Sequence, residues 1–166
     1  MAPRIFFWVQ HLLGIGHLKR TATLSRAFSR AGMDVTIVSG GHDVPGLDVT
    51  GAKLIQLPPV RAADKHFKTL VDENGLEIDE AFYERRRGLL LQAYEACSPD
   101  AVITELFPFG RRQLRNELTA LLDAAKTRPN RPLIVSSVRD ILVKPPKPQR
   151  VEEMLSRIET YYDRIL

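Results

Sequence analysis

The sequence is poor in cysteine and has no long apolar run. Its 166 residues include a single cysteine, Cys97, so the chain can form neither an internal disulfide nor a thiolate metal cluster. The longest apolar runs, residues 5–9 and 89–91, are far shorter than the ~20 residues that cross a bilayer. No cleavage site follows a leader-like apolar segment. These absences indicate a cytoplasmic protein, and Cys97, at the end of a predicted helix, is expected to be a buried structural thiol.

The sequence has a moderate excess of positive charge, and its basic residues are not clustered. Lysine and arginine together number 24 against 20 acidic residues, and the net charge of +4 favours anionic partners. The basic residues are scattered and no nucleic-acid-binding motif accompanies them, so nucleic acid is not an expected partner. The arginine run at residues 85–87 is expected to be a solvated helix face, the usual role of such runs.

Apolar runs alternate with segments of helical periodicity, which is typical of a parallel sheet covered by helices on both faces. We therefore predict an α/β fold class: one Rossmann-like, doubly wound parallel sheet with strand order 3-2-1-4-5 and a sixth strand that begins at Ile165. Residues 58–75 break the rhythm, and residues 72–75 predict a hairpin turn between short extended segments. The predicted strands are residues 4–9, 35–38, 53–57, 101–105 and 133–138, and the predicted helices are residues 16–31, 78–96, 110–126 and 151–162.

A loop with two glycines joins the first predicted strand to the first predicted helix. It consists of residues 14–17, Gly-Ile-Gly-His, and Gly32 stands where a left-handed cap would end the helix. Free N–H groups and the positive end of the helix dipole make such a turn an anion site. The loop therefore predicts a phosphate-bearing or otherwise anionic ligand with the imidazole of His17 beside it.

The spacing of this loop excludes two common kinds of glycine-loop site. A dinucleotide-binding loop would have its third glycine where Lys19 stands, and an acidic residue where Ser39 and two glycines follow the second strand. A nucleoside-triphosphate loop would need Gly-Lys-Ser/Thr at the required interval. Neither an NAD site nor a triphosphate loop is expected, and no cofactor or metal is expected either.

Several of these segments together resemble the N-terminal domain of GT-B glycosyltransferases. The likeness rests on residues 4–20, 24–28 and 32–41, and it continues through residues 99–110 and 133–140. It is nearest to a group of predicted bacterial glycosyltransferases akin to the MurG-type N-acetylglucosaminyltransferases of family 28. The MurG-type loop is richer in glycine than residues 14–17.

The resemblance implies two Rossmann-like domains that face each other across a cleft. This chain would be the N-terminal, acceptor-side half, and the C-terminal domain that holds most of the nucleotide-sugar would be absent. A strand that opens at residues 163–166 and stops also indicates a fragment of a longer polypeptide. The full-length protein is expected to transfer a sugar from a nucleotide-sugar, expected to be UDP-linked, to an unknown hydroxyl acceptor. Peripheral membrane association is compatible with this function, and the isolated chain is expected to be inactive.

The resemblance also gives roles to residues at the carboxyl ends of the predicted strands, the edge where open α/β sheets bind ligands. Sugar transfer needs a base for the acceptor proton, and His17 and Glu105 are the catalytic candidates. Either His17 is the base and Glu105 orients it, or Glu105 takes the proton while His17 contacts phosphate or acceptor. The candidates for substrate and phosphate binding are Gly14, Ile15, Gly16, His11, Arg111, Arg139 and Asp140.

Simpler structural roles and other functions remain open at this stage. A hydrolase or epimerase of nucleotide-sugars can use the same fold, and a nonenzymatic module that binds anions or carbohydrates is a further alternative. The structural alternatives are a loop-satisfying role for His17, a backbone-bonded buried ring for His11, an exposed helix start for Arg111 and Arg112, and a mutual salt bridge for Arg139 and Asp140.

Overall fold

The computed structural model describes residues 1–64, 67, 69–139, 142, 145 and 147–166, and it is built on a parallel sheet. Six strands lie in the order β3-β2-β1-β6-β7-β8, and every neighbouring pair is parallel. The predicted order is confirmed, including a sixth strand at Ile165. The strands are β1 (Arg4–Val9), β2 (Asp34–Ser39), β3 (Ala52–Gln56), β6 (Ala101–Glu105), β7 (Leu133–Ser137) and β8 (Arg164–Ile165).

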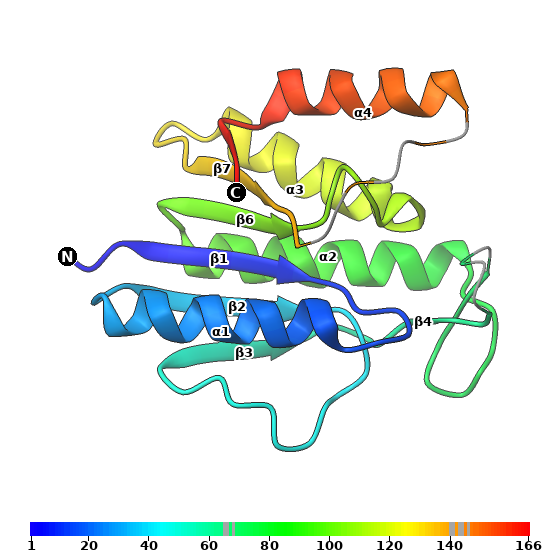
Figure 1. Ribbon diagram of the computed structural model, residues 1–166, viewed down its shortest axis with the longest axis horizontal. Helices are drawn as coiled ribbons and strands as arrows, with labels where there is room; N and C mark the ends of the chain where they lie inside the picture. Colours follow the sequence, from blue (N-terminus) through cyan, green and yellow to red (C-terminus); the bar gives the residue numbers. More distant parts are fainter. Residues whose placement is uncertain (65–66, 68, 140–141, 143–144, 146) are drawn as a thin grey trace.

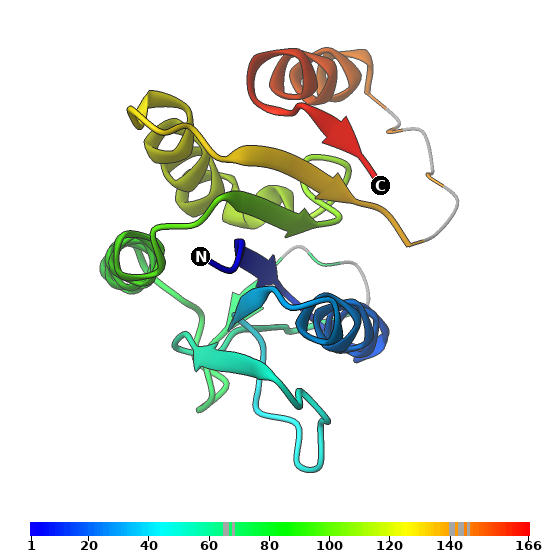
Figure 2. The same ribbon diagram turned by 90° about the vertical axis from the view of Figure 1, so that its left-hand side faces the viewer.

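The helices cover both faces of the sheet, as the alternation predicts. Figure 2 shows α1 on one side of the strands and α2 and α3 on the other, and Figure 1 shows α4 beside α3. Gly32 has a φ of 84° directly after α1, so the predicted left-handed cap is confirmed. None of the helices in the described part of the chain combines the length and apolar character that membrane crossing requires. The helices are α1 (Gly16–Arg30), α2 (Glu80–Cys97), α3 (Arg115–Thr127) and α4 (Pro148–Tyr161).

Strand β1 lies at the centre of the sheet and is apolar on both faces. Phe6 and Trp8 pack into the cluster under α2 and α3, whereas Phe7 and Val9 join the cluster under α1. All four side chains are fully buried. Because a strand between two helical layers exposes neither face, its sequence is continuously apolar instead of alternating. The glycine loop therefore follows a fully buried central strand and lies at the carboxyl edge of the sheet.

The insertion between β3 and α2 forms a small second sheet. The short extended segments predicted on either side of residues 72–75 are confirmed by a strand that ends at Val71 and by its antiparallel bridge to Glu77. Strand β4 (Arg61–Ala62) pairs antiparallel with β5 (Leu70–Val71). Strand β4 was not predicted, because a strand of two residues is too short to show a periodicity. The predicted turn at residues 72–75 is confirmed, because Asp72 Oδ1 accepts a hydrogen bond from the backbone N–H of Leu76.

The helix predicted over residues 110–126 begins later than its sequence pattern indicated. Arg111 has a φ of 63°, in the left-handed region that a right-handed helix excludes. A 3₁₀ turn follows at Arg112–Leu114, and α3 begins only at Arg115. The left-handed residue turns the chain, so Arg111 is not part of an exposed helix start.

Candidate active site

The carboxyl edge of the sheet brings His17 and Glu105 together. Strand β6 ends at Glu105, and His17 lies in the first turn of α1, which begins at Gly16. His17 Nδ1 lies 3.0 Å from Glu105 Oε1. The Glu105 side chain is 0% exposed and the His17 side chain is 15% exposed. The pair therefore has a buried carboxylate behind a partly exposed imidazole, and no residue that the structure describes forms a hydrogen bond with the Nε2 of that ring.

A cavity of about 260 Å³ opens beside His17. Its wall joins the glycine loop to two arginines that are distant in the sequence, so several of the predicted binding residues are brought together with His17. Arg111 comes from the turn before α3, and Arg139 follows β7. The lining residues are Leu12, Leu13, Gly14, Gly16, His17, Phe67, Arg111 and Arg139.

The two glycines of the loop have different surroundings. A Cβ on Gly16 would lie 2.0 Å from Arg139 Nη1, so the absent side chain makes room for that guanidinium. Gly14 has no atom within 4 Å of a Cβ position, so no contact among the described residues requires a glycine there. Ile15 precedes α1 and lines a separate hollow with Lys19, so its side chain is not part of the cavity wall.

The amino terminus of α1 is suited to an anion. The structure describes this helix in full, and it has neither an acidic residue in its first turn nor a side-chain hydrogen bond at its cap. Its first N–H groups and the positive end of its dipole therefore remain for a ligand or solvent. They lie at Gly16 and His17, on the wall of the same cavity.

Arg111 is held at the site by the end of β1. Its Nε donates a hydrogen bond of 2.7 Å to the backbone oxygen of Gln10. The pKa of Arg111 is lowered to about 10, mainly by burial; the carboxylate of Glu105 opposes the change and the nearby Arg139 adds to it. The guanidinium is still charged at neutral pH. Arg112, by contrast, is not a residue of the cavity wall and pairs with Glu153 of α4 at 3.2 Å.

His11 lies against the loop after β2 and is not a residue of the cavity wall. A Cβ on Gly41 would lie 2.3 Å from the His11 ring, so the two segments are in close contact. Burial lowers the pKa of His11, and His42 and Arg111 lower it further, while a hydrogen bond to the backbone of His42 raises it. His11 is buried, and among the described residues its Nδ1 has no hydrogen-bond partner. The last binding candidate, Asp140, lies outside the described residues.

Arg86 corrects the expectation of a solvated arginine face. It is fully buried, and its guanidinium contacts the segments that follow three strands as well as α3. It pairs with Glu117 at 2.9 Å and donates hydrogen bonds to Gln10 Oε1 at 3.1 Å, to the Gly40 oxygen at 3.0 Å and to the Pro58 oxygen. One buried cation thus ties together the segments that follow β1, β2 and β3, and Gln10 in turn holds Arg111.

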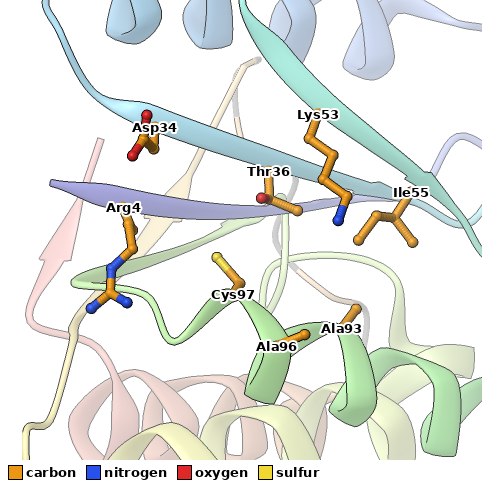
Figure 3. Close-up of a pocket in the computed structure, with 8 residues that line it drawn as sticks. All are labelled: Arg4, Asp34, Thr36, Lys53, Ile55, Ala93, Ala96 and Cys97. Carbon is orange, nitrogen blue, oxygen red and sulfur yellow. The ribbon is translucent and has the colours of Figure 1, made fainter. Parts of the chain in front are cut away.

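A second hollow, of about 170 Å³, surrounds Cys97 at the opposite edge of the sheet. Figure 3 shows the thiol directed toward Thr36, with Arg4 and Asp34 at the near ends of their strands. The thiol is half-buried, and burial raises the pKa of Cys97. Cys97 is therefore half-buried where full burial was expected, and its raised pKa makes the thiol a poor nucleophile at neutral pH.

No protein-family model and no curated protein matches the chain. Its fold matches solved glycosyltransferases. The glycosyltransferase from Rickettsia africae ESF-5 has a TM-score of 0.55 at 13% identity, over 99% of this chain and 42% of that one. SsfS6 from Streptomyces sp. SF2575 has a TM-score of 0.51 at 18% identity, over 82% and 39%. VinC in complex with DTDP has a TM-score of 0.50 at 14% identity, over 96% and 40%.

These comparisons define a class of fold. The chain has the α/β, Rossmann-like fold seen in part of each of these glycosyltransferases, so the expected fold class is confirmed. The chain spans less than half the length of each of the three structures.

Proposed function

We propose that this chain is the acceptor-side half of a GT-B glycosyltransferase that transfers a sugar from a nucleotide-sugar to a hydroxyl group. The observation that carries the proposal is the His17–Glu105 pair, at 3.0 Å, beside a cavity lined by two arginines. The shared fold supports it, and so does the DTDP bound to VinC. Placement near the MurG-type enzymes, a UDP-linked or dTDP-linked donor, and a cytoplasmic location with peripheral membrane contact belong to the same proposal.

His17 is the base in this proposal, and Glu105 orients it. A base must reach the acceptor hydroxyl, and the fully buried Glu105 side chain is the less accessible of the two. Donation from His17 Nδ1–H to the carboxylate fixes the tautomer in which Nε2 carries the lone pair. When Nε2 takes the acceptor proton, the adjacent carboxylate stabilises the imidazolium.

The departing nucleoside diphosphate is stabilised by positive charge on the wall of the same cavity. Arg111 and Arg139 supply guanidinium groups, and the amino terminus of α1 supplies N–H groups. Such donors are most effective where charge develops in the transition state. A second domain, outside these 166 residues, would supply the remaining donor contacts.

The experiment is a product analysis with the full-length protein. UDP-sugars and dTDP-sugars are incubated with it, with and without a panel of hydroxyl acceptors, and the products are identified by mass spectrometry. The proposal expects glycosylated acceptor that depends on His17 and is lost in His17→Ala. Free sugar formed equally with and without acceptor would instead identify a hydrolase, and unchanged donor in every reaction would contradict both activities.

A further inference from the structure

Arg20 lies one helical turn after His17 and contacts the same carboxylate. Its Nε is 3.8 Å from Glu105 Oε1, and its Nη2 donates a hydrogen bond of 3.3 Å to Ser137 Oγ at the end of β7. The Arg20 side chain is 28% exposed, so most of it is covered by the surrounding elements. The residue therefore connects α1 to the ends of β6 and β7 beside the proposed catalytic pair.

His17 and Arg20 meet at one oxygen atom, Glu105 Oε1. Among the described residues, Glu105 Oε2 is buried without a hydrogen-bond partner, and so is Arg20 Nε. A buried carboxylate that lacks solvent and has one accepted hydrogen bond favours its protonated form unless positive charge lies nearby. Arg20 supplies that charge from α1, and Arg111 supplies a second, electrostatic contribution from the turn before α3.

The protonation state of Glu105 decides what it can do for His17. An ionised carboxylate accepts the Nδ1–H of His17 and stabilises the imidazolium, whereas a protonated carboxyl group cannot do both. We propose that Arg20 is a positioning residue that keeps the Glu105 carboxylate anionic and in place, so that Glu105 orients His17. The catalytic meaning of this contact rests on the proposed function, but the contact can be tested without any substrate.

The test is an NMR titration of the His17 ring in the wild-type chain and in three arginine variants. The chain has four histidines, so the His17 signal is assigned by its loss in His17→Gln. Arg20→Gln removes the charge beside the pair, and Arg20→Lys keeps it. Arg26→Gln is the matched control, because Arg26 lies on the same helix and pairs with Asp48 at 3.5 Å, away from the cavity.

Loss of a positive charge makes proton binding by its neighbours more favourable. In Arg20→Gln the neighbour that takes up the proton is Glu105, and a neutral carboxyl group 3.0 Å from the ring no longer stabilises the imidazolium. The pH midpoint of the His17 signal should therefore fall by about one unit in Arg20→Gln, the usual effect of losing an opposite charge within contact distance. A rise would contradict the inference, because it would mean that Glu105 stays anionic without Arg20. Arg20→Lys should return the midpoint close to that of the wild type, and Arg26→Gln should leave it unchanged. A contact that served packing alone would alter stability without moving this midpoint.

Two other results would overturn the inference. One is a wild-type midpoint in folded Arg20→Gln, which would show that the guanidinium has no electrostatic influence on the pair. The other is loss of folding in Arg20→Gln while Arg26→Gln stays folded, which would assign Arg20 to the packing of the domain. Neither result depends on glycosyl transfer, so failure of this inference is distinguishable from failure of the product analysis.

Discussion

The two ring nitrogens of His17 have different chemical surroundings, and this difference separates the roles of single residues. Nδ1 faces a buried carboxylate at 3.0 Å, whereas the ring itself lines the cavity. A substitution of His17 removes the proposed proton acceptor. A substitution of Glu105 changes only the carboxylate that contacts Nδ1 of the ring. Kinetic effects of the two substitutions should therefore differ in size.

In the full-length protein, His17→Ala should lower kcat about 10²–10⁴-fold, the usual cost of losing a positioned base. Glu105→Gln should lower it less, because the amide oxygen still accepts the Nδ1–H although it carries no charge. Steady-state kinetics at saturating donor and acceptor give the comparison. A larger loss in Glu105→Gln would reverse the two roles, and wild-type rates in both variants would remove the pair from the chemistry.

His11 should make the domain less stable in acid. Its pKa is lowered in the folded state by burial, His42 and Arg111, so the unfolded chain takes up the proton first as the pH falls below about 6.5. The free energy of unfolding should thus decrease below that pH by up to about 1.4 kcal/mol per pH unit from this residue. Urea titrations at pH 5.5 and 7.5 should show a smaller difference for His11→Asn than for the wild type. The same difference in unfolding free energy between the two pH values in both proteins would contradict this role of His11.

At the level of helices and strands, periodicity predicted most of the fold. The apolar runs of β1 and β6 lie between two helical layers, and both strands match their predicted bounds. The start of α3 could not be predicted, because the left-handed Arg111 is a non-glycine residue. What holds Arg111 in place is its contact with Gln10, about a hundred residues earlier in the chain, and no local pattern encodes such a contact.

The sequence also allowed the meeting of His17 and Glu105 at the candidate site to be predicted. His17 and Glu105 were found because each stands at a strand end or just beyond it, and topology brings those ends to one edge. Arg86 was missed because a run of arginines usually faces solvent. A signal did exist, since Arg86 shares the helical spacing of Leu90 and Tyr94, which form the buried stripe of α2.

The buried Arg86–Glu117 pair should dominate the stability of the interface between α2 and α3. Arg86→Met should lower the free energy of unfolding by about 3–5 kcal/mol, because it leaves the Glu117 carboxylate buried and unpaired. Arg87→Met is the matched control, because Arg87 follows directly in the helix, is only partly buried and pairs with Glu84. This substitution should cost less than about 0.5 kcal/mol. Urea unfolding measures both. If Arg86→Met lost as little stability as Arg87→Met, Glu117 would have another partner in the variant.

At the level of the whole molecule, the cavity beside His17 has walls from one domain only. The chain covers 42% of the glycosyltransferase from Rickettsia africae, and the remaining part of such a protein would supply the other side. Under the proposed function, this chain alone should therefore bind UDP-sugars and dTDP-sugars weakly and transfer no sugar, whereas a protein with both proposed domains should bind them tightly and transfer the sugar. Isothermal titration calorimetry and product analysis on the two proteins test this. Multiple turnover by the isolated chain would contradict it.

The central place of β1 has a consequence for synthesis of the chain. Its neighbour β2 follows within the first 39 residues, but β6 pairs with it only from Ala101 onward. The helices that cover Phe6 and Trp8 also come late, since α2 begins at Glu80 and α3 at Arg115. A nascent chain that ends before these helices can cover the α1 side of the strand but leaves two large aromatic side chains exposed. Such surfaces are those that chaperones bind, so on the ribosome this domain should need protection until its second half emerges.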